Sequence, residues 1–230
     1  MRGGPAGRPV IEWSAAQRAK PGEVESGDQY VVCLSPELAL VGIVDGLGHG
    51  AEAAAAARRA VGTLQDNPGG GWETDGGGAP AIRLPPSSFR ADETIVSLVR
   101  RCHEALRPTR GAVMGLAVFR AWENGMQWLD VGNIEGVIVR AQATARPRVE
   151  RLLAYGGIVG HRLPRLHVST VPLTRDDVVV LATDGIRSDF AESLTADEPW
   201  QVLADRILAR YGKDSDDALV LVARYVGPAP

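Results

Sequence analysis

Short apolar runs, separated by turn residues, alternate along most of the chain and predict β-strands. Residues 29–35 and 39–45 are apolar and β-branched, and Pro36 and Glu37 stand between them, which predicts a hairpin. Similar runs follow in the second half of the chain. We expect further strands at 111–121, 126–133, 135–141, 149–154, 165–173, 177–184 and 216–226.

Three segments carry helical patterns. Residues 51–66 are alanine-rich, which favours a helix by propensity alone. Residues 87–107 place apolar side chains three and four positions apart, with Ser87 or Ser88 as an expected N-cap. A third helix is expected over 199–211. Helices before and after a long series of strands indicate an α+β or layered α/β/β/α architecture, with two sheets between helices.

Residues 67–88 differ from the rest of the chain because they are rich in glycine and proline and show no periodicity. Such composition predicts a flexible loop. The segment before it is too short to form a stable domain alone, so we interpret the loop as an insertion rather than a linker. The 230 residues are therefore expected to form one domain, 1–230.

Charge and cysteine content exclude several classes of function. The net charge is −3 and no basic stripe occurs, which gives nucleic-acid binding no electrostatic support. We interpret the scarcity of lysine (Lys20 and Lys213) as compositional bias. Cys33 and Cys102 lack zinc-type spacing, and reduced thiols in a cytoplasmic protein are expected. No signal peptide or membrane span is expected.

Acidic residues stand at the ends of the predicted strands. Asp28 precedes the first strand of the hairpin, Asp45 ends the second, Asp184 follows 177–183, and Asp216 precedes the last strand. Each alone is typical of an ordinary turn. Together they can gather at one rim of a sheet sandwich, where clustered carboxylates persist only if they are protonated or paired with cations. Hard oxygen ligands favour Mg²⁺ or Mn²⁺ over zinc.

The motifs "ESGDQY", "VDGLGHG", "ATDGI" and "DDALVLV" occur in this order between residues 25 and 222. Together they resemble the metal-dependent PPM (protein phosphatase 2C-like) serine/threonine phosphatases, and more narrowly their SpoIIE-type branch. The short form with "PGEVESGD" near its start is similar to the stressosome phosphatases of that branch. The resemblance implies a four-layer αββα sandwich of two antiparallel β-sheets flanked by helices.

The resemblance also implies a centre of two Mn²⁺ or Mg²⁺ ions at one edge of the sandwich. By motif, Asp45 would bridge both ions, and Gly46 would offer its backbone carbonyl to one of them. Asp184 and Asp216 would bind the other ion. Asp28 would help to hold the centre, directly or through water. Asp45 is thus both a metal ligand and an expected catalytic residue.

Some positions depart from the family pattern. Leu47 stands where animal-type members have a histidine, and His49, two residues later, is the candidate to protonate the leaving oxygen or else a packing or surface residue. Arg18 is a weak candidate for the family's phosphate-binding arginine. Direct ligation by Asp217 is not expected, and Leu219 is expected to have no chemical role.

Two glycine-containing segments border the expected site. Residues 131–139, "VGNIEGVIV", resemble a strand-turn-strand element of the family, and we interpret the Gly-Asn pair as a hairpin turn rather than a chemical group. Residues 154–164, "AYGGIVGHRLP", are either a flap over the substrate or a mobile loop, and the loop is favoured.

The implied function is hydrolysis of phosphoserine or phosphothreonine on signalling proteins by metal-activated water, with stressosome or STAS-domain regulators as implied partners. The oligomeric state stays open. The alternative is a non-catalytic scaffold or phosphoprotein-binding module of the same fold, which the presence of all four acids disfavours. Dinucleotide binding and a GHKL-type ATPase are also disfavoured, because the required spacings and companion motifs are missing.

Overall fold

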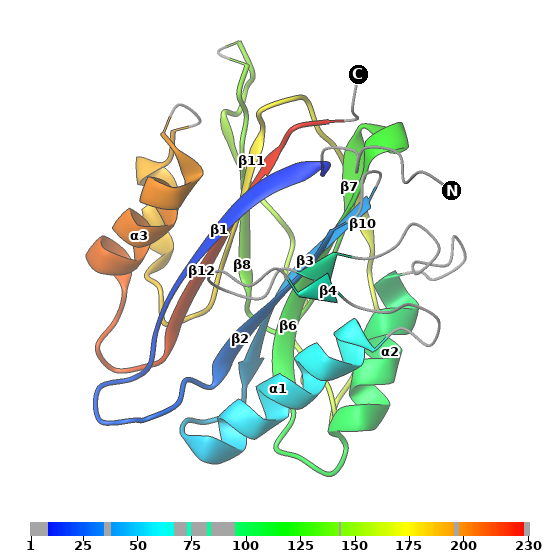
Figure 1. Ribbon diagram of the computed structural model, residues 1–230, viewed down its shortest axis with the longest axis vertical. Coiled ribbons are helices and arrows are strands. Elements are labelled where there is room, and N and C mark those ends of the chain that lie inside the picture. Colours follow the sequence, from blue (N-terminus) through cyan, green and yellow to red (C-terminus); the bar gives the residue numbers. More distant parts are fainter. Residues whose placement is uncertain are drawn as a thin grey trace.

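Two β-sheets pack face to face between helices in the computed structural model of the protein (Figure 1). The structure describes residues 9–34, 38–66, 73–74, 82–83, 95–142, 144–195 and 198–227. Helix α3 covers one sheet, and helices α1 and α2 cover the other. The predicted αββα sandwich is therefore confirmed.

The first sheet has five strands in the order β1-β12-β11-β8-β9. All its neighbouring strands are antiparallel. Their bounds are β1 Ile11–Arg18, β8 Glu135–Val139, β9 Val149–Arg151, β11 Val178–Ala182 and β12 Ala218–Tyr225.

The second sheet has seven strands in the order β10-β7-β6-β3-β2-β5-β4. Its pairs are antiparallel except for β2 with β5, which is parallel. The bounds are β2 Asp28–Leu34, β3 Leu38–Gly46, β4 Glu73–Thr74, β5 Ile82–Arg83, β6 Ala112–Arg120, β7 Gly125–Val131 and β10 Ser169–Pro172.

Three apolar layers hold the sandwich together, and single strands contribute to two of them. In β12, Leu219 and Leu221 face the other sheet, whereas Val220 and Val222 pack toward α3. Successive side chains of a strand point to opposite faces. Strands covered on both faces therefore consist of nearly continuous apolar residues, as the sequence of β12 does.

Three α-helices cover the outer faces of the sheets in the described part of the chain: α1 Ala51–Gln65, α2 Ile95–Leu106 and α3 Trp200–Tyr211. Short 3₁₀ helices occur at Ala121–Glu123 and Ser188–Ser193. Helix α1 packs through small side chains such as Ala53 and Ala57, which let it approach β2 and β3 closely. None of these helices is both long enough and apolar enough to cross a bilayer.

The predicted strands and helices are present, with differences at their ends, and three observed strands were not predicted. Strand β1 was not predicted, because its sequence IEWSAAQR mixes apolar and polar residues and the strand lies at a sheet edge with mostly half-buried side chains. Strands β4 and β5 lie within the predicted loop 67–88. The rest of that loop, the turn at 35–37 and the expected helical residues 87–94 lie outside the described residues.

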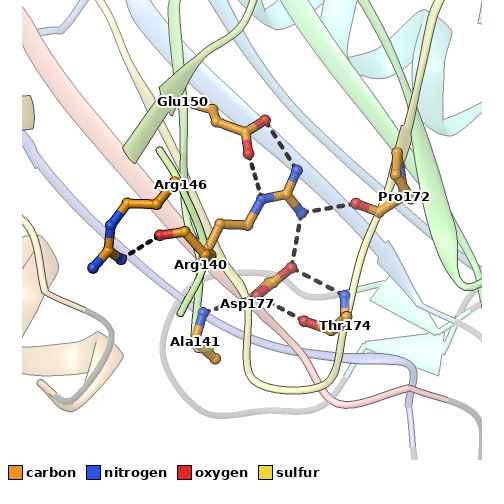
Figure 2. Close-up of polar contacts among 8 residues, drawn as sticks. Arg140, Ala141, Arg146, Glu150, Pro172, Thr174 and Asp177 are labelled. Atoms are coloured by element: carbon orange, nitrogen blue, oxygen red, sulfur yellow. Dashed lines mark hydrogen bonds and ion pairs between the residues drawn. The ribbon is translucent and has the colours of Figure 1, made fainter. Parts of the chain in front are cut away.

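A partly buried ion-pair network joins the two sheets at one end of the sandwich (Figure 2). Arg140, after β8, donates to both carboxylate oxygens of Glu150 at 2.8 and 3.0 Å and to the carbonyl of Pro172 at 2.8 Å. It also donates to Asp177 at 2.9 Å. The hydrogen bonds to Glu150 raise the pKa of Arg140 above its usual range. Since Pro172 belongs to the seven-stranded sheet, this network ties one sheet to the other.

Candidate metal centre

The predicted acids meet in one cleft at the end of the sandwich opposite the Arg140 network. The cleft has a volume of about 300 Å³. Of the expected metal-site side chains, Asp45, Asp184 and Asp216 line it, and Asp28 is buried next to Asp45. Lys20, His49 and Asn133 also line the cleft.

Antiparallel pairing explains why these acids come together. Asp28 begins β2 and lies directly opposite Asp45 near the end of β3. Asp184 follows β11, and Asp216 precedes β12, its antiparallel neighbour. The start of β2 therefore lies beside the end of β3, and the end of β11 lies beside the start of β12. Both pairs of acids reach the same rim of the sandwich.

The glycine after each main acid is required by space. A Cβ on Gly46 would lie 2.1 Å from the carbonyl oxygen of Ala53, at the start of α1. A Cβ on Gly185 would lie 1.7 Å from the carbonyl oxygen of Asp217. Gly48 and Gly50 are needed for a different reason, because both have positive φ angles, 91° and 73°. The turn from β3 into α1 thus depends on all three glycines of the "DGLGHG" motif.

Among the described residues, the acids of the cleft form no ion pair with a basic side chain, although Lys20 lines the same cleft. Burial, together with the carboxylates of Asp184, Asp216 and Asp217, raises the pKa of Asp45 to about 7. Burial also raises the pKa of Asp28 well above its usual value, with Asp45 as the second cause. Clustered acids of this kind favour either a proton or a bound cation.

Two further side chains hold the acids in place. Thr183 donates its hydroxyl proton to Asp28 Oδ2 at 2.7 Å, which partly offsets the rise in the Asp28 pKa. Asp217 accepts hydrogen bonds from the backbone N–H groups of Lys20 and Gly27, both at 2.8 Å. Because both oxygens of Asp217 are used in this way, it holds the loop before β2, in line with the expectation that it is not a direct ligand.

His49 lies at the mouth of the cleft with its side chain 56% exposed. Its Nδ1 is 2.7 Å from Glu23 Oε1. In the residues that the structure describes, Nε2 has no hydrogen-bond partner and is available to a substrate. Arg18 does not line the cleft; it donates to the carbonyl of Lys213 and pairs with Asp214, both at 3.0 Å.

The sequence interpretation underestimated Asn133 and the two lysines. Asn133 occupies the expected turn between β7 and β8, and its amide also donates to Asp184 Oδ2 at 3.0 Å. Lys213 donates its ammonium proton to the carbonyl of Asp184. Lys20 lines the cleft. Both lysines stand within eight residues of an acidic motif, and this proximity could have marked them as residues near the site. Their scarcity in the composition does not show this.

The segment 154–164 is attached to the start of β6. Val159 pairs with Ala112. Gly160 donates its N–H to His103 Nδ1 at 3.0 Å, and His161 Nε2 lies 3.0 Å from the carbonyl oxygen of Thr109. These contacts differ from the free loop that we favoured from the glycine content.

The cleft has the chemistry of a site for hard divalent cations. Its acidic side chains present only oxygen atoms, and burial with mutual repulsion favours a positive charge among them. Within the described ranges, no three acidic, histidine or cysteine side chains are close enough to enclose an ion as they stand. A bound cation would have to draw the side chains of the cleft together.

Known structures give the same fold class. A structure described as "The bacterial stressosome: a modular system that has been adapted to control secondary messenger signaling" is 28% identical, with a TM-score of 0.72, and covers 93% of this chain and 99% of its own. RsbX in complex with magnesium is 16% identical over 93% of this chain and 94% of its own, with a TM-score of 0.72. The PP2C phosphatase domain of SpoIIE from Bacillus subtilis is 20% identical over 95% of this chain and 64% of its own, with a TM-score of 0.68.

The sandwich and its acidic cleft therefore define a PP2C-type phosphatase fold. A family model described as "Stage II sporulation protein E (SpoIIE)" matches residues 35–226, and the chain belongs to this family. No curated protein sequence matches the chain significantly. Family and fold together support a protein phosphatase, as the sequence motifs predicted.

Proposed function

We propose that the protein is a Mn²⁺- or Mg²⁺-dependent phosphatase that hydrolyses phosphoserine and phosphothreonine on signalling proteins. The observation that supports this proposal best is the raised pKa of Asp45 in a cleft of carboxylates from four strand ends. A purely structural cluster would pair its acids with arginines, which are plentiful in this chain. Membership of the SpoIIE family supports the same activity.

In this proposal, Asp45, Asp184, Asp216 and the carbonyl of Gly46 would hold the ions, and Asp28 would support Asp45 from the neighbouring strand. When bound, two such ions supply positive charge for the phosphoryl group and activate the attacking water. The protein's own contribution is to fix these oxygen atoms at one rim and to keep Asp184 in place through Asn133 and Lys213.

We retain His49 as the proposed donor of a proton to the leaving oxygen. Glu23 Oε1 lies 2.7 Å from Nδ1 of the ring, and a carboxylate in this position orients a histidine. His49→Gln should slow hydrolysis of a phosphoserine peptide by roughly a hundredfold. It should leave p-nitrophenyl phosphate hydrolysis within a few-fold, because that leaving group needs no proton. Equal effects on both substrates would contradict the role.

Phosphorylated stressosome or STAS-domain regulators are the proposed substrates. The similarity to RsbX and to a structure from the bacterial stressosome supports this choice. Candidate phospho-STAS proteins would be incubated with the enzyme and Mn²⁺, and loss of phosphate followed by mass spectrometry. Release from an unrelated phosphoprotein at the same rate would contradict the proposed specificity.

The activity itself is tested with p-nitrophenyl phosphate. We expect turnover with Mn²⁺, none with excess EDTA, and a loss of more than about a hundredfold in Asp45→Asn, beyond the 10–100-fold typical of groups outside the ligand shell. Circular dichroism would show that the variant is folded. Absence of Mn²⁺-dependent turnover on every phosphoester would favour the non-catalytic scaffold instead.

A further inference from the structure

Lys20 is an unusual cation among those around the cleft. In the residues that the structure describes, its ammonium group has no ion-pair partner, although the residue lines a cleft of carboxylates. Three neighbouring basic side chains have acidic partners: Arg18 with Asp214, Arg110 with Glu52, and His49 with Glu23. Lys213 donates to the backbone carbonyl of Asp184 and does not line the cleft, so Lys20 is the lysine or arginine of the described cleft lining that an incoming anion can use.

The backbone of Lys20 is fixed by contacts from distant parts of the chain. Its N–H donates to Asp217 Oδ1 at 2.8 Å, and its carbonyl accepts from Glu23 at 2.9 Å in a tight turn. The second oxygen of Asp217 accepts from Gly27, so one carboxylate ties both ends of the 20–27 loop. Asp217 is next to Asp216 in sequence. The loop that carries Lys20 is therefore held in register with an acid of the proposed metal centre.

A phosphoryl group that enters this cleft must approach several carboxylates. Like charges repel each other strongly where burial lowers the local dielectric response. An ammonium group donates charge-assisted hydrogen bonds to phosphate oxygens and offsets part of that repulsion. Arg18, the other basic candidate, is engaged with Asp214 outside the cleft.

We propose that Lys20 binds the phosphoryl oxygens of the substrate and that Asp217 acts as its positioning residue. The inference rests on the proposed phosphatase function and names a residue of this chain that binds the substrate's phosphate. Lys20 acts as a point charge on a flexible stem, so an arginine at this position should serve almost as well. Asp217 acts only through the loop that it holds.

Inorganic phosphate, titrated calorimetrically into the Mn²⁺-loaded protein, tests the role of Lys20. Loss of a hydrogen bond to a charged group corresponds to a roughly ten- to hundredfold weaker affinity, which we expect for Lys20→Ala. Lys20→Arg should stay within a few-fold of wild type. Arg107→Ala, which removes an exposed cation paired with Glu104, is the matched control and should change nothing. Unchanged phosphate affinity in Lys20→Ala would overturn the proposal.

Kinetics separate this proposal from the function on which it rests. With p-nitrophenyl phosphate, Lys20→Ala should raise KM more than it lowers kcat, and its Mn²⁺ affinity should match that of wild type. If the wild-type protein hydrolyses p-nitrophenyl phosphate and Lys20→Ala binds phosphate as tightly as wild type, the role of Lys20 is refuted. The phosphatase function is then unaffected. If Lys20→Ala lowers the phosphate affinity but the wild-type protein shows no turnover, the phosphatase function is refuted and the phosphate-binding role of Lys20 is supported.

The role of Asp217 is tested by a double-mutant cycle. Asp217→Asn should weaken phosphate binding in the wild-type background, because an amide cannot accept both backbone N–H groups. In the Lys20→Ala background it should cause no further loss. A merely structural role would give the same loss in both backgrounds and would contradict the assignment. Should Asp217→Asn fail to fold, Asp217→Glu, which keeps the charge but displaces both acceptor oxygens, enters the same cycle.

Discussion

Strand β11 has a buried acid network at its start and an acidic cleft at its end, and the two differ in how their carboxylates are compensated. Asp177, just before the strand, is 0% exposed and accepts hydrogen bonds from Arg140, the N–H of Ala141, and both the N–H and hydroxyl of Thr174. Asp184, just after the strand, accepts one side-chain hydrogen bond, from Asn133. Only the five-residue strand Val178–Ala182 and Thr183 separate the two acids.

The difference separates the acids that the protein compensates with its own groups from those that a bound cation would compensate. Around Asp177 the protein supplies its own cation, and Arg140 also joins Glu150 and Pro172 (Figure 2). Around Asp45 the described residues form no ion pair, although Lys20 lines the cleft, and burial with neighbouring carboxylates raises the pKa of Asp45 to about 7. A buried charge without a partner costs free energy, so it persists where something outside the chain compensates it. The contrast thus supports a cation site at one end of β11 and structural pairing at the other.

The largest effect on stability is expected at the structural end. Asp177→Ala removes the acceptor of four hydrogen bonds, from Arg140, Ala141 and Thr174, and at about 1 kcal/mol for each we expect a loss of about 3–5 kcal/mol, although Arg140 keeps its pair with Glu150. Denaturant unfolding would measure this loss, while turnover per folded molecule should stay at the wild-type level. As a matched control, Asp189→Ala removes an exposed partner of Arg187 and should cost less than about 1 kcal/mol. A loss of activity in folded Asp177→Ala would contradict the division between the two ends.

Asp130 is an intermediate case, with one oxygen satisfied and one not. It is 1% exposed, Oδ1 accepts from the N–H of Tyr155 at 3.0 Å, and Oδ2 is buried without a partner among the described residues. Burial raises the pKa of Asp130 to about 7, so the folded state binds this proton more tightly than the unfolded state. Its contribution to stability is therefore full below about pH 4 and is lost as the pH rises through 7.

The expected loss between pH 4 and 8 is on the order of 2–4 kcal/mol, from the size of the shift. Unfolding free energies of wild type and Asp130→Asn, measured across this range, isolate the contribution of Asp130 because all other acids are shared. The variant should show the flatter pH dependence. Parallel curves would mean that a further partner compensates the Asp130 carboxylate. Asp130 would then resemble the compensated Asp177 rather than the acids of the cleft.

The sequence was sufficient to predict which acids gather at one rim of the sandwich. It was insufficient to predict which side chains and backbone groups bond to them. Asp45 and Asp184 end apolar runs, and strand ends of antiparallel pairs must meet at a rim, so local pattern and motif order were enough. Lys20 meets Asp217 across 197 residues, and Asn133 meets Asp184 across 51, and no local pattern encodes either contact. Strand β1 escaped prediction for a related reason, since an edge strand lacks the regular burial that produces alternation.

The smallest predicted effect concerns the single hydrogen bond that Asp184 receives. Asn133→Ala removes the donor 3.0 Å from Asp184 Oδ2 and should weaken Mn²⁺ binding by about tenfold, the lower end for groups that orient a metal ligand. A Mn²⁺ titration measures this directly. In an Asp184→Asn background the same change should have no further effect, because the carboxylate that Asn133 orients is gone. Additive losses would mean that Asn133 contacts the ion or the substrate itself. Asn133 would then be a binding residue of the cleft, unlike the purely structural partners of Asp177.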